Sequence, residues 1–354
     1  MEFLMARHCE QSVIWTSGTN GYHTYRIPSI IVTTKGTVLS FCEGRRNSSD
    51  DTGDIDMLVK RSVDGGHTWS DQELIWRDAG NTCGNPCSVV DQKTGIIWLL
   101  MTHNLGVDRE SMIIDKTSQG SRTVWVTASE DDGRTWRAPL EITNAVKRED
   151  WTWYATGPGN GIQLSSGRLL VPCDHIEGST KRYYSHVIYS DNHGKTWNIG
   201  GTTPLDQVNE CCIAELTNGE VLLNTRNYDR GSRTRQISSS DDGGLTWRDQ
   251  HHNAELIEPI CQAALVRHPS QDGLLFSNPA DRESRRNLTV RLSEKAGRSW
   301  RYCRVLHPGP SAYSSLAVLS DGTIVCLYER GDDHPYETIM MARFGLDWLL
   351  AGLD

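Results

Sequence analysis

Short apolar runs alternate with turn residues along almost the whole chain. Six segments share one pattern: an apolar run, a turn that carries or adjoins a glycine, and a second apolar run. The runs are rich in Val, Ile and Leu and are bounded by Gly, Asn, Asp or Ser, which is typical of antiparallel strands joined by tight turns. The pattern predicts six β-hairpins, SIIVTTKGTVLSF, SVVDQKTGIIWLL, GIQLSSGRLLVP, CIAELTNGEVLLN, AALVRHPSQDGLLF and SSLAVLSDGTIVCLY.

A turn motif forms a second repeat between the hairpins. A third β-branched segment leads into Ser-x-Asp-x-Gly-x-Thr-Trp or a close variant, and a less regular fourth strand follows. Four strands in each unit, repeated every ~50 to 70 residues, predict an all-β, six-bladed β-propeller. The sixth unit lacks the motif, so we expect the early segment SVIWTSG to join that blade and close the ring. The five copies lie at Ser62–Trp69, Ser129–Trp136, Ser190–Trp197, Ser240–Trp247 and Ser293–Trp300.

Composition favours one soluble domain over residues 1–354. Of the 354 residues 37% are hydrophobic, and no apolar run is long enough to span a bilayer. The repeats leave no linker of biased composition between them. The formal charge of −9 argues against a nucleic-acid or anionic membrane partner, because both favour a basic surface. An anionic ligand would therefore need a local cluster of cations.

The ten cysteines are interpreted as free thiols. Most lie within or beside apolar strand segments, where a thiol behaves as a small hydrophobic group. The N-terminal MEFLMARHCEQ lacks the apolar core of a signal peptide, so we expect a cytoplasmic protein, with secretion as the alternative if a leader was removed. Cys83 and Cys87 are spaced like half a zinc site, but no second pair follows. We expect no metal or other cofactor.

Hairpin geometry separates the ends of the strands into two rims. The residue that enters the first strand of a hairpin and the residue that leaves the second lie at the edge opposite the turn. The third strand then ends at the turn edge, which places the five motifs on the same rim as the hairpin turns. We interpret the motifs as structural turns and not as calcium loops, since Asn192 and Lys295 replace the Asp in two copies.

The opposite rim is expected to collect charged and aromatic residues. Several arginines that meet in one pocket would form an anion receptor, because guanidinium groups stay charged and match a carboxylate. The alternative for any single residue is a solvated charge or a packing aromatic. Aromatic Trp153 and Tyr154 are expected on this rim, as sugar pockets are commonly lined by aromatic faces. The charged and phenolic candidates are Arg26, Arg45, Arg46, Asp50, Asp51, Glu210, Arg226, Arg282, Arg285, Arg286, Tyr313, Glu329 and Arg330.

An ordered set of motifs carries a family resemblance. YRIP lies near the N-terminus, followed by the repeated turn motif, by NECCIAEL and LNTR, and by a late AYSSL. In this order they resemble the bacterial-type retaining exo-α-sialidases, over almost the whole catalytic domain of that family. The resemblance implies hydrolysis of terminal sialic acid from a sialylated glycan, without a cofactor.

The resemblance also implies a role for each matching residue. Arg26, Arg226 and Arg285 would bind the substrate carboxylate, with Arg286 as the alternative to Arg285. Arg45 would reach the 4-hydroxyl group and Glu329 would hold Arg26. Asp51 would be the general acid and base, with Asp50 as the alternative, and Tyr313 with Glu210 would form the nucleophile pair.

Charge explains why a tyrosine would replace the usual carboxylate nucleophile of a retaining glycosidase. The reacting carbon of a sialoside bears a carboxylate, and a second carboxylate at 4 Å would be repelled by about 4 kcal/mol for an effective dielectric near 20. A neutral phenol avoids this repulsion but needs a base to accept its proton. The alternatives are a sialoside-binding propeller without catalysis and an enzyme that transfers the sialyl group or releases an anhydro product. Linkage preference and oligomeric state stay open.

Overall fold

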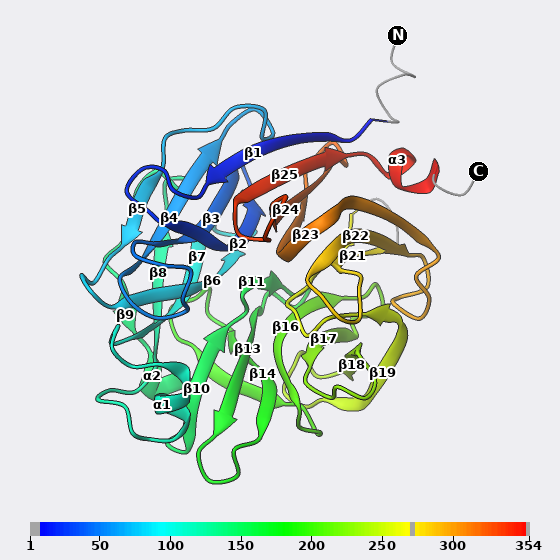
Figure 1. Cartoon of the computed structure of the whole chain (residues 1–354). Coiled ribbons are helices and arrows are strands. Elements are labelled where there is room, and N and C mark those ends of the chain that lie inside the picture. Colours follow the sequence, from blue (N-terminus) through cyan, green and yellow to red (C-terminus); the bar gives the residue numbers. More distant parts are fainter. Residues whose placement is uncertain (1–7, 270–272, 352–354) are drawn as a thin grey trace.

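A computed structural model describes residues 8–269 and 273–351. Antiparallel strands dominate it and are grouped in sheets around a common centre (Figure 1). The three described helices are short and lie in connections or at the C-terminal end: α1 (Glu110–Ile114), α2 (Thr143–Val146) and α3 (Leu346–Leu350).

The N-terminal part contains two antiparallel groups, β2-β3-β4-β5 and β6-β7-β8-β9. A parallel bridge between Ile55 and Thr82 joins them into one larger sheet. The first two hairpins of the sequence prediction are confirmed by β2 with β3 and by β6 with β7. The bounds are β2 Thr24–Val32, β3 Val38–Arg45, β4 Ile55–Ser62, β5 Glu73–Trp76, β6 Thr82–Val90, β7 Ile97–Asn104, β8 Thr123–Ser129 and β9 Leu140–Glu141.

The middle of the chain adds β10-β13-β14-β15 and β16-β17-β18-β19. The expected first strand of the third hairpin, GIQL, is divided, because only Ile162 and Gln163 pair with β13 there and Trp151–Thr156 forms the longer partner. The segment WTWYAT is thus itself a strand. The bounds are β10 Trp151–Thr156, β11 Gly159–Asn160, β12 Ile162–Gln163, β13 Leu169–Glu177, β14 Tyr183–Ser190, β15 Asn198–Thr202, β16 Val208–Glu215, β17 Val221–Asn227, β18 Thr234–Ser240 and β19 Arg248–Ile257.

The C-terminal sheet contains the junction of the two chain ends. The early segment joins the last group, since β1 pairs with β25 from Glu10 opposite Arg343 to Thr16 opposite Thr338. The expected pairing of the early segment with the last unit is confirmed, and Figure 1 shows β1 beside β25. The turn of the fifth hairpin, at residues 270–272, lies outside the described residues. The bounds are β1 Glu10–Thr16, β20 Ala264–His268, β21 Gly273–Pro279, β22 Arg286–Ser293, β23 Tyr302–Val318, β24 Ile324–Arg330 and β25 Thr338–Phe344.

The turn motifs repeat one set of hydrogen bonds. In the first copy the Gly66 amide donates to Ser62 Oγ at 2.7 Å, and the Thr68 hydroxyl donates to Asp64 Oδ2 at 2.6 Å. Asn192 replaces the acid in the third copy and still accepts from the Thr196 amide at 2.9 Å. The motif tryptophans pack into the apolar clusters between neighbouring sheets. The motif is therefore a structural turn, as predicted, and its tryptophan also fills the core.

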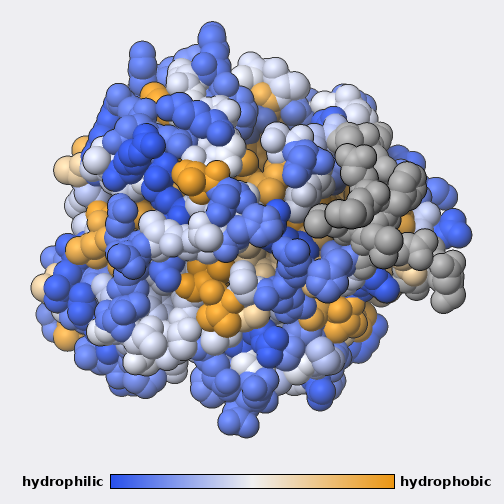
Figure 2. Space-filling model, turned by 90° about the horizontal axis from the view of Figure 1, so that it is seen from above, coloured by the Kyte–Doolittle hydropathy of each residue, from blue (hydrophilic) through white to orange (hydrophobic). Residues whose placement is uncertain are grey.

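Apolar side chains are largely buried between the sheets, and all ten cysteines are free thiols. The side of the molecule in Figure 2 is mainly hydrophilic, with apolar residues in small separate patches. Within residues 8–269 and 273–351, no helix combines the length and the apolar character needed to cross a membrane.

Candidate active site

A polar pocket of about 120 Å³ opens at the edge of the sheets opposite the turn motifs. The register fixes the two edges: Arg26 pairs with Glu43 at the pocket end of β2 and β3, whereas Val38 pairs with the motif residue Ser62 at the other end. Strands far apart in the sequence supply the pocket wall. The predicted residues that line it are Arg26, Arg45, Asp51, Glu210, Arg226, Arg285 and Tyr313.

Three of these side chains lie where the pairing between neighbouring strands is irregular. Register shifts occur between Arg26 and Ser29 in β2, between Val208 and Cys211 around Glu210 in β16, and between Ser311 and Ser314 around Tyr313 in β23. A bulge of this kind re-aims a side chain and is common beside active sites. The local breaks in the strands thus turn these groups toward the pocket.

The buried carboxylate of Glu329 holds Arg26 in place. The Nε atom of Arg26 donates to Glu329 Oε1 at 3.2 Å, and the backbone amides of Ile27 and Tyr313 donate to the same carboxylate at 2.8 and 3.0 Å. Ile27 has a φ of 60°, a strained value for a β-branched residue. Glu329 therefore fixes both the arginine and the backbone of the strand that carries the phenol.

Tyr313 lies at the centre of the cationic groups. Its hydroxyl donates to Glu210 Oε1 at 2.5 Å and accepts from Arg226 Nη1 at 3.0 Å. The Cζ atoms of Arg26 and Arg285 lie 5.1 and 5.6 Å from the centre of its ring. Three guanidinium groups from separate strands or loops thus converge on one phenol.

Burial and the charge of Glu210 determine the protonation of the phenol. Together they raise the pKa of Tyr313 well above its usual value, although Arg226, Arg285 and Arg26 act in the opposite direction. The resting side chain is therefore a neutral phenol with a carboxylate in position to accept its proton. The three arginines do not outweigh burial and the charge of Glu210.

Asp51 lies at the mouth of the pocket, with 65% of its side chain exposed. It contacts Arg45 Nη1 at 2.7 Å and Arg26 Nη1 at 3.2 Å. Desolvation would raise the pKa of Asp51, but Arg45 and Arg26 outweigh it and lower the value to about 2. Asp50 is exposed, does not line the pocket and donates its backbone amide to Ser48.

The register separates the two adjacent arginines of the fifth unit. Arg285 lines the pocket and donates to the Tyr336 hydroxyl at 2.9 Å, whereas Arg286 is exposed. Other rim arginines serve local contacts outside the pocket. Arg46 pairs with Asp56, Arg282 donates to the Ser232 carbonyl and Arg330 pairs with Asp332.

The pocket also contains residues that the sequence motifs did not reveal. Trp153 lines it as expected, with the Arg122 guanidinium 3.9 Å from its ring centre, but the neighbouring Tyr154 is turned into the core. One signal was available: Asp174 directly follows the apolar run LLVPC within β13. The other residues occur once each and belong to no repeat. The unpredicted lining residues include Glu43, Asn85, Glu110, Arg122, Asp174, Asn209 and Tyr228.

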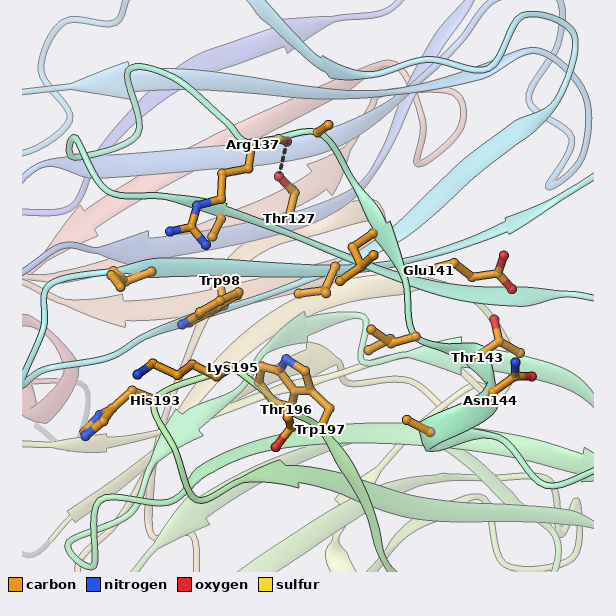
Figure 3. Close-up of a pocket in the computed structure, with 18 of the residues that line it drawn as sticks. Trp98, Thr127, Arg137, Glu141, Thr143, Asn144, His193, Lys195, Thr196 and Trp197 are labelled. Carbon is orange, nitrogen blue, oxygen red and sulfur yellow. Dashed lines mark hydrogen bonds between the residues drawn. The ribbon is translucent and has the colours of Figure 1, made fainter.

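A larger hollow of about 880 Å³ lies at the rim of the turn motifs. Figure 3 shows Trp98 and Trp197 beside each other in it, with ring centres 6.3 Å apart and an interplanar angle of 78°. The single carboxyl group of its described lining belongs to exposed Glu141. Since no acid is paired with a nucleophile there, the smaller polar pocket is the candidate active site.

The chain is similar to a known family and to known proteins. Residues 36–326 match the BNR repeat-like domain family. The sialidase of Bacteroides fragilis is 32% identical over 90% of this chain, which spans 62% of the length of that relative. The exo-α-sialidase of Aspergillus fumigatus is 30% identical, with 94% of this chain and 86% of the relative covered.

A solved sialidase structure has a similar fold. The Hadza microbial sialidase Hz136 has a TM-score of 0.87 and 30% sequence identity, with 96% of this chain and 69% of that chain covered. The chain belongs to the BNR repeat-like family. Its relatives place it among the sialidases of that family.

Proposed function

We propose that the chain folds as one six-bladed β-propeller and acts as an exo-α-sialidase on terminal sialic acid of glycoconjugates. The four-stranded antiparallel groups around one centre and the pairing of β1 with β25 support the blade count. The observation that carries the activity is the contact of Tyr313 with Glu210 and Arg226 beside two further arginines. This set of groups suits a sugar whose reacting carbon bears a carboxylate.

The three arginines supply the binding energy for the carboxylate. Arg26, Arg226 and Arg285 would surround it, and a charged hydrogen bond of this kind contributes more than a neutral one. Arg226 also contacts Glu210 at 2.6 Å, so its guanidinium group is already oriented before the substrate carboxylate binds. Arg45, held by Glu43 at 2.6 Å, would reach a ring hydroxyl.

Tyr313 would attack the anomeric carbon while Glu210 accepts its proton. The phenol is neutral until attack, so it approaches the carboxylate-bearing carbon without charge repulsion. The carbon–oxygen bond to the leaving group breaks as the bond to the phenol oxygen forms. The product of this step is a tyrosyl glycoside, and a second displacement by water gives net retention.

Asp51 would protonate the leaving oxygen and then accept a proton from the attacking water. Contacts with Arg26 and Arg45 keep this carboxyl ionised. A substrate carboxylate competes for Arg26, which weakens its contact with Asp51 and raises the affinity of Asp51 for a proton. Binding thus prepares the acid for its first step.

A 4-methylumbelliferyl sialoside tests the proposal. We expect fluorophore release by the unmodified protein and initial formation of the α-anomer of sialic acid by proton NMR, because two displacements retain configuration. Binding without release would favour a non-catalytic sialoside-binding protein. Initial β-anomer would rule out the tyrosyl intermediate, and an anhydro or transferred product would identify a different acceptor in the second step.

A further inference from the structure

The hollow of about 880 Å³ at the motif rim lies between the second and third units. Its walls come from β7, β8, β9 and α2 on one side and from the third turn motif, His193 to Trp197, on the other. The outer strand of the second unit, β9, has only two residues, whereas β15 and β19 of the next two units have five and ten. The short outer strand thus leaves the space between these two units open.

The lining of the hollow is mainly apolar and aromatic. The rings of Trp98 and Trp197 meet nearly edge to face in it, and Ile96 and Ile142 are only partly buried against the same apolar cluster. Leu140 at its edge is 65% exposed. Pockets of ~300–1,000 Å³ with such a lining and a few polar groups are typical of sites for small molecules. The hollow therefore suits a compact apolar body.

The charged side chains of the hollow are separated by sign. Figure 3 shows Arg137 and Lys195 on the left of the view and Glu141 on the right. His193, beside Lys195 in the chain, is already paired with the buried carboxylate of Asp91 at 2.8 Å. In a chain with a net charge of −9, one end of an apolar hollow thus has two permanent cations. This arrangement is complementary to an anion that is attached to an apolar body.

Both cations lie near the Trp98 indole and can be reached from solvent. The Arg137 guanidinium is 6.0 Å from the centre of that indole and is paired with the exposed Glu130. Lys195 follows Gly194, which is so close to the indole that an added Cβ would lie 2.1 Å from it. Lys195 is exposed and forms no ion pair among the described residues. The two charges are therefore accessible to a ligand whose apolar part lies in the hollow.

We propose that this hollow binds an organic anion with a compact aromatic body. The rings of the ligand would pack against Trp98, Leu140 and Ile142, and its carboxylate or sulfonate group would face Arg137 and Lys195. Burial of the apolar body would supply most of the binding energy, and the exposed ion pairs would add a smaller part. The hollow lies at the rim opposite the candidate active site, so the inference does not depend on the proposed sialidase function.

Two fluorescent probes of nearly the same shape test the site. The first, 8-anilinonaphthalene-1-sulfonate, has an aromatic body and an anion, and the second, N-phenyl-1-naphthylamine, has the same body without the sulfonate. We expect saturable binding of the sulfonate to a single site, detected by energy transfer from tryptophan. Added salt should weaken the binding of the sulfonate and leave that of the neutral probe nearly unchanged, because salt screens exposed charges.

Substitutions at exposed positions place the binding in the hollow. Arg137→Gln combined with Lys195→Gln should lower the affinity for the sulfonate about tenfold and leave the affinity for the neutral probe unchanged, because two charge contacts are lost. Lys35→Gln, at an exposed hairpin turn on the same rim, is the matched control and should change neither affinity. Leu140→Ser should weaken the binding of both probes about fivefold through the loss of apolar contact. Leu205→Ser, at an exposed leucine outside the hollow, should have no effect.

Three results would overturn the inference. The first is the absence of saturable binding of the sulfonate, or binding that none of the substitutions in the hollow changes. The second is equal affinity for the two probes without an effect of the two cations, which would assign the hollow to a neutral ligand. The third is a dimer that Leu140→Ser dissociates in light scattering, which would assign the hollow to a contact between copies of the chain. Sialoside turnover is measured separately, and its absence would contradict the proposed function and not this site.

Discussion

The two rims of the molecule differ in how they use repetition. At the turn-motif rim, successive units place the same residues in the same hydrogen bonds, with Ser129 and Ser240 each accepting from a glycine amide at 2.8 and 2.9 Å. At the pocket rim no common motif recurs, and the arginines, acids and phenol come from strand ends of different sequence. The units share the geometry of their strands at this rim. The side chains that could act in catalysis belong to no repeated motif.

This difference separates stability from function. A turn repeated in five units serves what those units share, namely a closed turn and an indole in the core. A pocket at the centre needs one phenol, one base and several cations, so its residues cannot repeat. Substitutions at the pocket rim should therefore affect turnover, and those at the motif rim should affect unfolding.

The largest expected effect is the loss of the phenol. Tyr313→Phe removes the nucleophilic oxygen but keeps the ring, and we expect kcat on the fluorogenic sialoside to fall about 10³-fold or more. The control on the motif rim is Tyr189→Phe, whose ring lies 4.3 Å from the Arg168 guanidinium and should leave turnover unchanged. Normal turnover by Tyr313→Phe would remove the tyrosyl intermediate from the mechanism.

A smaller loss is expected from the carboxylate-binding arginines. Arg285→Ala should lower kcat/KM about 10²-fold, because the substrate carboxylate loses one charged partner in a desolvated site. Its exposed neighbour provides the matched control, and Arg286→Ala should change kcat/KM less than twofold. Steady-state kinetics of both variants show which arginine binds the substrate carboxylate. A larger loss of kcat/KM in Arg286→Ala would assign that contact to Arg286.

On the motif rim the expected effect is on stability. Asp131 accepts from Ser129 Oγ at 2.9 Å, the Thr135 amide at 2.8 Å and Thr135 Oγ1 at 2.6 Å. Asp131→Ala should lower the free energy of unfolding by about 1–2 kcal/mol, with kcat unchanged. Activity loss without destabilisation would contradict the division between the rims.

The same variant carries a pH signature. Desolvation acts to raise the pKa of Asp131, but the hydrogen bonds from Thr135 and Ser129 lower it to about 2. Because the folded pKa lies below the unfolded one, this stabilisation is complete above about pH 4 and is lost as the pH falls toward 2. Thermal melts should show the gap between the unmodified protein and Asp131→Ala narrowing over that range.

The smallest expected effect is the gain in stability from restoring the Asp of the fifth motif. Lys295 stands where other copies have Asp, although the Gly297 amide still donates to Ser293 Oγ at 2.9 Å. Lys295→Asp supplies the missing acceptor and should stabilise the fold by up to about 1 kcal/mol without a change in turnover. Chemical denaturation measures the gain, and a loss of stability would show that this turn differs from the others.

The repeats made most of the fold predictable. Alternating apolar runs and turn glycines identified hairpins such as β2 with β3, and the missing sixth motif identified the closure by β1. The third unit was predicted less well because its inner strand is divided between β10 and β12. A short apolar run beside WTWYAT gave no local sign of which segment would pair with β13.

The pocket was predictable only where a residue belongs to an ordered motif. The placement of Tyr313 beside Glu210 and Arg226 agrees with the prediction from the motifs, while the roles of these residues remain proposals. Asp174 and Arg122 were missed, since one charged residue in a strand looks like any other until its neighbours are known. The choice between Arg285 and Arg286 depended on strand register, which local sequence does not fix.

The sequence by itself determined the repeated strands, the turn chemistry and the types of side chain at the strand ends, because these depend on contacts between residues near one another in the chain. Tertiary structure decided which of those side chains meet, how the bulges aim them and which of them stay neutral. Those properties depend on burial and on charges from distant strands, such as Glu210 beside Tyr313, separated by 103 residues. No local pattern contains that information.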